Sequence, residues 1–514
     1  MRCIGNNRKE NNGREAVKGN RTDGQAFNPF LPGREYIPDG EPRLFGGRVY
    51  LYGSHDRFGA PFFCVNDYVC WSAPADDLSN WRYEGIIYRK IQDPGNKLGL
   101  RLLFAPDVVQ GRDGRYYLYY AFDFMGVMGV AVCDTPCGKF RFYGHIRYPD
   151  GKVWGRRKGD AFPFDPGVLV DDDGRVYLYS GFYYRIPAFV TGGKRLQYDG
   201  GCVLELEQDM VTIKTPQKLL FPKSGIGAFE NHEFFEASSI RKFEGKYYFV
   251  YSSRHNHELC YAVSDSPTEG FIYGGTLVSN GDVFWEEIED GGAQNQGAGK
   301  SISSRPHNYM GNNHGGMLAL NGEYYIFYHR HTNRSSYSRQ ACAEKLVRNP
   351  DGSFRQAEIT SCGLNGAPLV GKGYYEARIA CNLWAKEGTG RYDGLNPGWR
   401  LKGHPYFTQD GAEGNPRARQ YIANMRDGAT AGFKYFRFEN LKHIRVRLRG
   451  KAEGSLWVFA DEAGKQTVAR IPVKSRGRAW RIFSAEARAA EGIGALYFVY
   501  QGQGAVDFLD FVLE

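Results

Sequence analysis

The sequence predicts an all-β protein in which a five-bladed β-propeller is followed by a C-terminal, jelly-roll-like β-sandwich. Three observations carry this prediction. The 514 residues include 66 glycines, 35 tyrosines and 34 phenylalanines, a mixture typical of many short strands joined by tight turns. One turn-and-strand pattern recurs five times in the first two thirds of the chain, and closely spaced strand-like segments fill about the last 80 residues.

The repeated pattern pairs a glycine-containing turn with an alternating run of aromatic and β-branched residues, which predicts a hairpin turn followed by a half-buried strand. The copies start 67, 60, 71 and 77 residues apart, room for about four short strands, as in a propeller blade. A pair of β-sandwiches is the alternative, but their strands would recur every 8–12 residues or so. The five copies are GGRVYLYGSHD (46–56), DGRYYLYYAFD (113–123), DGRVYLYSGFY (173–183), EGKYYFVYSSR (244–254) and NGEYYIFYHRH (321–331).

The chain divides into three predicted parts. Residues 1–26 are a polar extension, residues 27–372 contain the repeats, and residues 373–514 form the second domain. From about residue 433 this last part reads as short strands separated by turn signals, which is typical of a small β-sandwich.

Composition excludes several classes of function. Charged residues make up 24% and apolar residues 42% of the chain, the balance of a globular protein. The net charge of +9 is scattered without a basic cluster, so we expect no nucleic-acid partner. Residues 1–25 lack the apolar stretch of a signal or membrane span, so we expect a cytoplasmic protein with no membrane partner and reduced cysteines. The sequence predicts no oligomeric state.

Three carboxylates hold similar places ahead of repeated strands. Asp39 (IPDGEPRLF), Asp165 (FPFDPGVLV) and Glu236 (HEFFEASSI) precede the first, third and fourth copies. Each lies in an apolar or aromatic setting, where a carboxylate is costly unless it is paired or used in chemistry. Because a propeller gathers one end of every blade around its axis, we expect the three to meet in one site. A capping or ion-paired acid is the alternative for each of them alone.

Residues 27–372 resemble the family 43 glycoside hydrolases in the order and spacing of DGEP, FAPDVV, DPGVLVDDDGRVYLY, FFEASSI and NNHGG. The resemblance implies a five-bladed propeller with Asp39 as general base, Glu236 as general acid and Asp165 as the carboxylate that tunes the pKa of the acid. Glu41 is the rival base, because the family usually has Asp-Pro where this chain reads Asp-Gly-Glu-Pro. Glu233 is a weaker rival to Glu236.

These roles belong to inverting hydrolysis. One carboxylic acid protonates the leaving oxygen, and a carboxylate about 6.5–9.5 Å away activates a water molecule on the opposite face. The acid must keep its proton near neutral pH, so we expect burial and an ionised Asp165 to raise the pKa of Glu236. The chemistry requires no cofactor.

Further residues are candidates for substrate binding. By resemblance Asp107 lines the sugar pocket, His314 lies near the axis beside a calcium or other ion, and Arg339 reaches substrate hydroxyls. A structural aspartate, a core histidine and a surface arginine are the respective alternatives. Aromatic side chains that flank the acids would stack on sugar faces, although such residues are more often core. These are Phe104, Phe164 and Phe235.

The resemblance implies an exo-acting hydrolase that releases a terminal pentose from plant cell-wall oligosaccharides, with α-L-arabinofuranose expected first and β-D-xylose second. Retaining fructoside chemistry, phosphorolysis and a non-catalytic glycan-binding propeller are the alternatives on the same fold. The second domain resembles family 6 carbohydrate-binding modules. This implies sugar stacking, for which Trp480 and Tyr421 are candidates, and a structural calcium ion; a domain that only packs against the propeller is the alternative.

Overall fold

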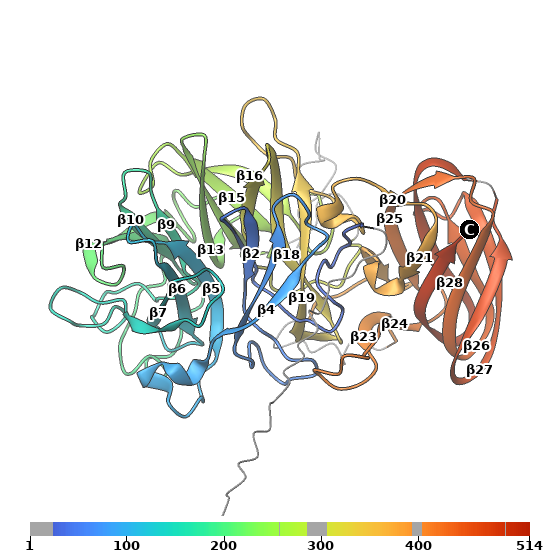
Figure 1. Cartoon of the computed structure of the whole chain (residues 1–514), viewed down its shortest axis with the longest axis horizontal. Helices are drawn as coiled ribbons and strands as arrows, with labels where there is room; N and C mark the ends of the chain where they lie inside the picture. The colour runs from blue at the N-terminus through green and yellow to red at the C-terminus, as the bar shows by residue number, and fades with distance from the viewer. Residues whose placement is uncertain (1–23, 256, 285–305, 393–402, 489) are drawn as a thin grey trace, which may run out of the picture.

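The computed structural model describes residues 24–255, 257–284, 306–392, 403–488 and 490–514. Within these residues the chain is all β, as predicted, and its helices are four single 3₁₀ turns. Figure 1 shows a ring of sheets with a second β domain at one side. The 3₁₀ turns are η1 (Lys90–Gln92), η2 (Pro94–Asn96), η3 (Gly363–Asn365) and η4 (Ala377–Ile379).

Five antiparallel sheets form the propeller, four with four strands and the last with three strands among the described residues. Blade 1 consists of β1 (Glu41–Phe45), β2 (Arg48–Tyr52), β3 (Tyr68–Pro74) and β4 (Arg82–Tyr88). Blade 2 consists of β5 (Leu103–Gln110), β6 (Tyr116–Phe122), β7 (Met128–Cys133) and β8 (Arg141–His145). Blade 3 consists of β9 (Gly167–Val170), β10 (Val176–Ser180), β11 (Gly200–Leu206) and β12 (Ile213–Pro222). Blade 4 consists of β13 (Phe234–Phe243), β14 (Lys246–Ser253), β15 (Leu259–Ser264) and β16 (Ile272–Val278), and blade 5 of β17 (Met317–Leu320), β18 (Glu323–Thr332) and β19 (Ser335–Leu346).

The five sequence repeats are the second strands of the blades, β2, β6, β10, β14 and β18. Their alternation has a direct structural reason, because successive side chains of a strand point to opposite faces of its sheet. In β6, Leu118 and Tyr120 pack against blade 1, whereas Tyr117 and Tyr119 pack against blade 3. Both faces of each blade are therefore buried, which explains why the repeats are apolar or aromatic at nearly every position.

The ring is closed by contact between the first and last blades. The first strands of neighbouring blades contact one another all the way round, from β1 through β5, β9, β13 and β17 back to β1. Gly40 and Gly315 form a parallel bridge where blades 1 and 5 meet. A Cβ atom on Gly315 would lie 1.9 Å from the carbonyl oxygen of Phe327, so only glycine fits this approach. The predicted five-bladed propeller is confirmed.

The C-terminal domain is a β domain around its own apolar core. Its first strand lies close to the boundary expected at 372/373, and β28 forms the centre of the sheet because it pairs with β21, β24, β25 and β26. The strands are β20 (Leu369–Val370), β21 (Gly373–Glu376), β22 (Asn382–Trp384), β23 (Tyr406–Gln409), β24 (Gln420–Met425), β25 (Thr430–Glu439), β26 (His443–Phe459), β27 (Thr467–Glu486) and β28 (Glu491–Leu513).

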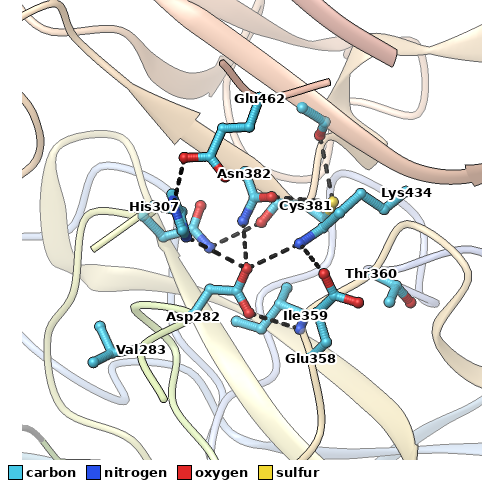
Figure 2. A network of polar contacts seen from close by, with 12 residues as sticks. Asp282, Val283, His307, Glu358, Ile359, Thr360, Cys381, Asn382, Lys434 and Glu462 are labelled. Carbon is cyan, nitrogen blue, oxygen red and sulfur yellow. Dashed lines mark hydrogen bonds and ion pairs between the residues drawn. The ribbon is translucent and has the colours of Figure 1, made fainter. Parts of the chain in front are cut away.

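A buried ionic network joins the two domains (Figure 2). Asp282, from the propeller, accepts a hydrogen bond from Asn382 Nδ2 at 2.9 Å and pairs with Lys434 Nζ at 3.0 Å. Lys434 Nζ also contacts Glu358 Oε1 at 2.8 Å. Burial alone would lower the pKa of Lys434, but the two carboxylates raise it, so the lysine stays charged in the interface. The contact between the domains is thus specific.

Among the residues that the structure describes, no helix has the length and apolar character needed to cross a bilayer.

Removal of one side chain between blades tests the packing. Leu118 is fully buried between blades 1 and 2. We expect Leu118→Ala to lower the free energy of unfolding by about 2–5 kcal/mol, because it removes apolar contacts and leaves a cavity. Leu98 is 83% exposed, so Leu98→Ala is the matched control and should change stability little. Denaturant unfolding curves of both variants measure the difference; equal stability would contradict the assigned packing.

Candidate active site

The three predicted acids line one cavity of about 260 Å³ at the propeller. The structure also brings Phe104, Phe164, Phe235, His314 and Arg339 to this cavity, although they come from different blades. The remaining lining residues that the structure describes are Phe63, Cys64, Ala105, Phe124, Phe182, Tyr184, His257, Gly311, Asn312, Ser336, Arg391 and Tyr392.

Asp39 lies directly before β1 in a left-handed backbone conformation, with φ of 57°. Its backbone N–H donates to His329 Nδ1 at 3.3 Å, and Arg339 Nη1 donates to its Oδ1 at 2.9 Å. Burial raises the pKa of Asp39, while the Arg339 guanidinium lowers it. The site therefore holds a buried carboxylate whose negative charge is compensated by one fixed cation.

Arg339 links Asp39 to Asp56 in a charge network that the sequence did not reveal. Its Nε and Nη2 donate to the two carboxylate oxygens of Asp56 at 2.9 and 3.0 Å, a bidentate pair. Its backbone N–H also donates to Asp56 at 3.0 Å. Asp56 ends the first repeat, GGRVYLYGSHD, four residues after β2 ends, and a charged residue at the end of this mostly apolar repeat was the available signal.

The two rival acids lie outside the cavity-lining set of the described residues. Glu41 accepts hydrogen bonds from Arg241 Nη2 at 2.6 Å and from Ser239 Oγ at 3.0 Å. Burial raises the pKa of Glu41 to about 7 against the opposing effect of Arg241. Glu233 Oε2 pairs with His255 Nε2 at 2.9 Å. These hydrogen bonds and this ion pair join both rival acids to side chains outside the cavity lining.

Glu236 reaches the cavity through a β-bulge in β13. The register of β13 with β14 shifts on both sides of Glu236, and the next residue, Ala237, has a φ of 68°. Bulges of this kind redirect a side chain. The Ala237 N–H donates to Asp165 Oδ2 at 2.9 Å, so Asp165 holds the backbone beside Glu236 in place.

The acids shift one another's pKa values. Burial raises the pKa of Glu236 well above its usual value, and the charges of Asp165 and Asp39 raise it further. Burial and Asp39 likewise raise the pKa of Asp165. Burial and the neighbouring charges thus favour the protonated form of Glu236, which is the form that a general acid needs.

His314 lies between the carboxyl groups of Asp165 and Glu41 and is neutral. Its Nδ1 is 3.7 Å from Asp165 Oδ2, and its Nε2 is 3.9 Å from Glu41 Oε1. Burial and the nearby Arg339 lower the pKa of His314 to about 3. The imidazole therefore adds a hydrogen-bonding group without adding charge.

Asp107 is the one predicted substrate residue that the structure places outside the cavity lining. It is a fully buried residue of β5, where Arg43 Nε donates to its Oδ1 at 2.9 Å and the backbone N–H of Val168 donates to its Oδ2 at 2.8 Å. These contacts join blades 1, 2 and 3, as a structural aspartate would.

Aromatic side chains form the cavity wall. Phe104 packs edge-on against Phe164 at a centroid distance of 5.8 Å, and Phe164 contacts Phe182 at 4.7 Å. Phe124 and Tyr184 continue the wall, and neither follows from the repeats. In the second domain, Trp480 and Tyr421 contact each other edge to face, and the Arg449 guanidinium covers both rings.

One group among the described residues has the spacing of metal ligands, and it excludes His314. His232 Nδ1 and Glu258 Oε1 are 3.2 Å apart, and Cys260 Sγ lies 3.7 Å from the histidine. Imidazole and thiolate ligands suit zinc-like ions, whereas calcium takes oxygen ligands. This group therefore does not fit the expected calcium ion, which stays a prediction.

Comparisons with known proteins identify the family of this chain. The model of glycosyl hydrolases family 43 matches residues 27–354. A protein of Thermoclostridium stercorarium named xylosidase/arabinosidase is 49% identical over 492 residues, which cover 95% of this chain and 99% of that protein. An arabinoxylan arabinofuranohydrolase of Paenibacillus polymyxa is 25% identical and covers 91% of this chain and 71% of its own length.

A solved family 43 arabinoxylan arabinofuranohydrolase from Bacillus subtilis covers 96% of this chain and 98% of its own, with 21% identity and a TM-score of 0.48. The family match spans the whole propeller, and the relative from T. stercorarium extends it over the second domain. The chain therefore belongs to glycosyl hydrolase family 43 and is a glycoside hydrolase.

Proposed function

We propose that this glycoside hydrolase releases terminal pentoses from short oligosaccharides with inversion, using Asp39 as general base and Glu236 as general acid. One observation carries the proposal: acids from three blades line a single cavity, and Asp165 binds the backbone next to Glu236. Inverting hydrolysis needs one carboxylate to activate water and one carboxylic acid to protonate the leaving oxygen.

Asp39 suits the base. Arg339 compensates its charge, so Asp39 is the member of the group that ionises first. Glu41 makes a poorer base, because its carboxylate is turned toward Arg241 and Ser239.

Glu236 suits the acid. No ion pair between Glu236 and a cation is found among the described residues, and burial and the neighbouring carboxylates raise its pKa against the opposing charge of Arg339. Asp165 has two effects on it: its charge raises the pKa of Glu236, and its hydrogen bond to Ala237 fixes the bulge that directs Glu236 into the cavity.

α-L-Arabinofuranose is the first proposed leaving sugar and β-D-xylose the alternative. The relatives named xylosidase/arabinosidase and arabinoxylan arabinofuranohydrolase support both sugars. A cavity walled on several sides by phenylalanines accepts a chain end more readily than the middle of a polymer, which supports exo action. The nine described cysteines are free, eight of them buried, which supports a reducing compartment such as the cytoplasm.

Substitution of the acids tests their roles. We expect Asp39→Asn to lower kcat/KM on every pentoside by about 10²–10⁴-fold, because the variant lacks the proposed general base. Glu236→Gln should lose as much on natural linkages but far less on aryl pentosides with good leaving groups, which need little protonation. Glu244→Gln, in an exposed turn, is the control. Steady-state kinetics on matched substrates give the answer; full activity of Asp39→Asn would refute the base.

The pH profile tests Asp165. Glu236 works protonated, so kcat/KM falls as the pH rises through its pKa. Because the charge of Asp165 raises that pKa, Asp165→Asn should move the alkaline limb of the profile to lower pH. Asp173→Asn, in an exposed turn, should leave the limb where it is. An unmoved limb in Asp165→Asn would rule out the electrostatic role.

The stereochemistry tests the mechanism as a whole. We expect the first-formed sugar to carry the anomeric configuration opposite to that of the substrate, because water attacks directly from the side of Asp39. Proton NMR within the first minutes, before mutarotation, shows which anomer appears. Retention of configuration would show that a carboxylate attacks the sugar instead.

A further inference from the structure

Part of the cavity wall comes from outside the family 43 domain. The family match ends at residue 354, yet Arg391 and Tyr392 line the same cavity as the catalytic acids. Both belong to the segment that follows β22 in the C-terminal domain. The cavity is therefore completed by a part of the chain that the propeller repeats do not include.

Tyr392 is held rigidly in this wall. Its backbone N–H donates to the Met310 carbonyl at 2.7 Å, and its own carbonyl accepts from Ser336 Oγ at 2.6 Å. Its ring stacks on Tyr309 at 5.5 Å, and its hydroxyl contacts His404 Nε2 at 2.5 Å. Contacts on every side fix the position of the neighbouring Arg391.

Arg391 bridges to blade 4 beside the acid. Its Nη2 donates to the carbonyl of His255 at 2.7 Å, and the His255 side chain pairs with Glu233. In the same loop, His257 lines the cavity and packs against Phe235 at a centroid distance of 4.6 Å. The partly exposed Arg391 thus lies beside the loop between β14 and β15, and this loop packs against Phe235, the residue before Glu236.

We propose that Arg391 determines specificity by binding hydroxyl groups of the sugar on the leaving side of the cleaved bond, with Tyr392 as its positioning residue. This inference rests on the proposed role of Glu236. A general acid contacts the glycosidic oxygen, so the leaving sugar extends from Glu236 toward the residues around it. A guanidinium offers several N–H donors in one plane, which suits the oxygens of neighbouring hydroxyls.

The ionic network between the domains fixes the position of this part of the cavity wall relative to the propeller. Asn382 in β22, just before the segment, binds Asp282 (Figure 2), and the backbone N–H of Leu383 donates to the His307 carbonyl at 2.8 Å. Lys434 neutralises the same Asp282. The C-terminal domain therefore takes part in substrate selection through its rigid attachment, whether or not it binds sugar itself.

Kinetics on two substrates with the same terminal pentose test the proposal. One is a 4-nitrophenyl pentoside, which has no leaving sugar, and the other is a xylo-oligosaccharide carrying that pentose. We expect Arg391→Ala to lower kcat/KM on the oligosaccharide by about tenfold, mainly through KM, and to affect the aryl pentoside clearly less. Arg391→Lys should recover part of the loss. Arg419→Ala, an exposed arginine of the same domain paired with Asp410, should change neither substrate.

Each other outcome overturns the inference. Equal losses on both substrates would show that Arg391 only supports the cavity, and unchanged kinetics would show that it does not contact substrate. A melting temperature equal to that of the wild type shows that Arg391→Ala folds; if it does not fold, Arg391→Lys provides the same comparison. Failure of the proposed function can be told apart from failure of this inference. If the proposed function is wrong, the wild-type protein will hydrolyse neither the 4-nitrophenyl pentoside nor the xylo-oligosaccharide.

Discussion

The buried contact of Arg339 with Asp39 and Asp56 is the constraint on which the active site depends. It joins β19 of the last blade to residues before and after the first two strands of the first blade, across about 300 residues of sequence, and so links ring closure to the placement of Asp39. A buried charge that loses its partner costs about 3–5 kcal/mol. The same guanidinium therefore stabilises the closed ring, opposes the effect of burial on the pKa of Asp39 and lowers the pKa of His314.

The cavity around the Arg339 guanidinium removes the three carboxyls from water. Burial is the largest cause of the raised pKa of Asp39, Asp165 and Glu236 alike, but only Asp39 has a guanidinium hydrogen-bonded to its carboxylate. An apolar wall and one asymmetrically placed cation thus give chemically similar carboxyls different electrostatic surroundings, as the proposed base and acid require. Enzymes commonly separate the pKa values of paired carboxyls in this way.

The fold was predictable because the alternation of the repeated strands has a local cause, the burial of both faces of each blade. The acids were predictable because they precede those strands at similar places. The choice between Asp39 and Glu41 was harder, since the two are separated by only one residue; it depends on the left-handed turn at Asp39 and on Arg241, 200 residues away. Sequence spacing cannot express either feature.

Other parts of the site gave no usable pattern. Asp107 lies in a motif that resembles a sugar-binding one, yet its two carboxylate oxygens accept hydrogen bonds from Arg43 and from a backbone N–H. Arg391 and Tyr392 lie in a glycine-rich stretch without periodicity, so no strand or helix pattern placed them. Their position depends on how the second domain packs, which is a property of two surfaces rather than of one segment.

The network around Asp282 has an evolutionary consequence. Domains that are joined by a flexible linker and share few contacts can be exchanged independently of one another. Here the C-terminal domain supplies Lys434, the partner of the buried Asp282, and it also supplies part of the cavity wall. An exchange of this unit between relatives would have to preserve both surfaces at once, so the two halves of the chain are expected to diverge together.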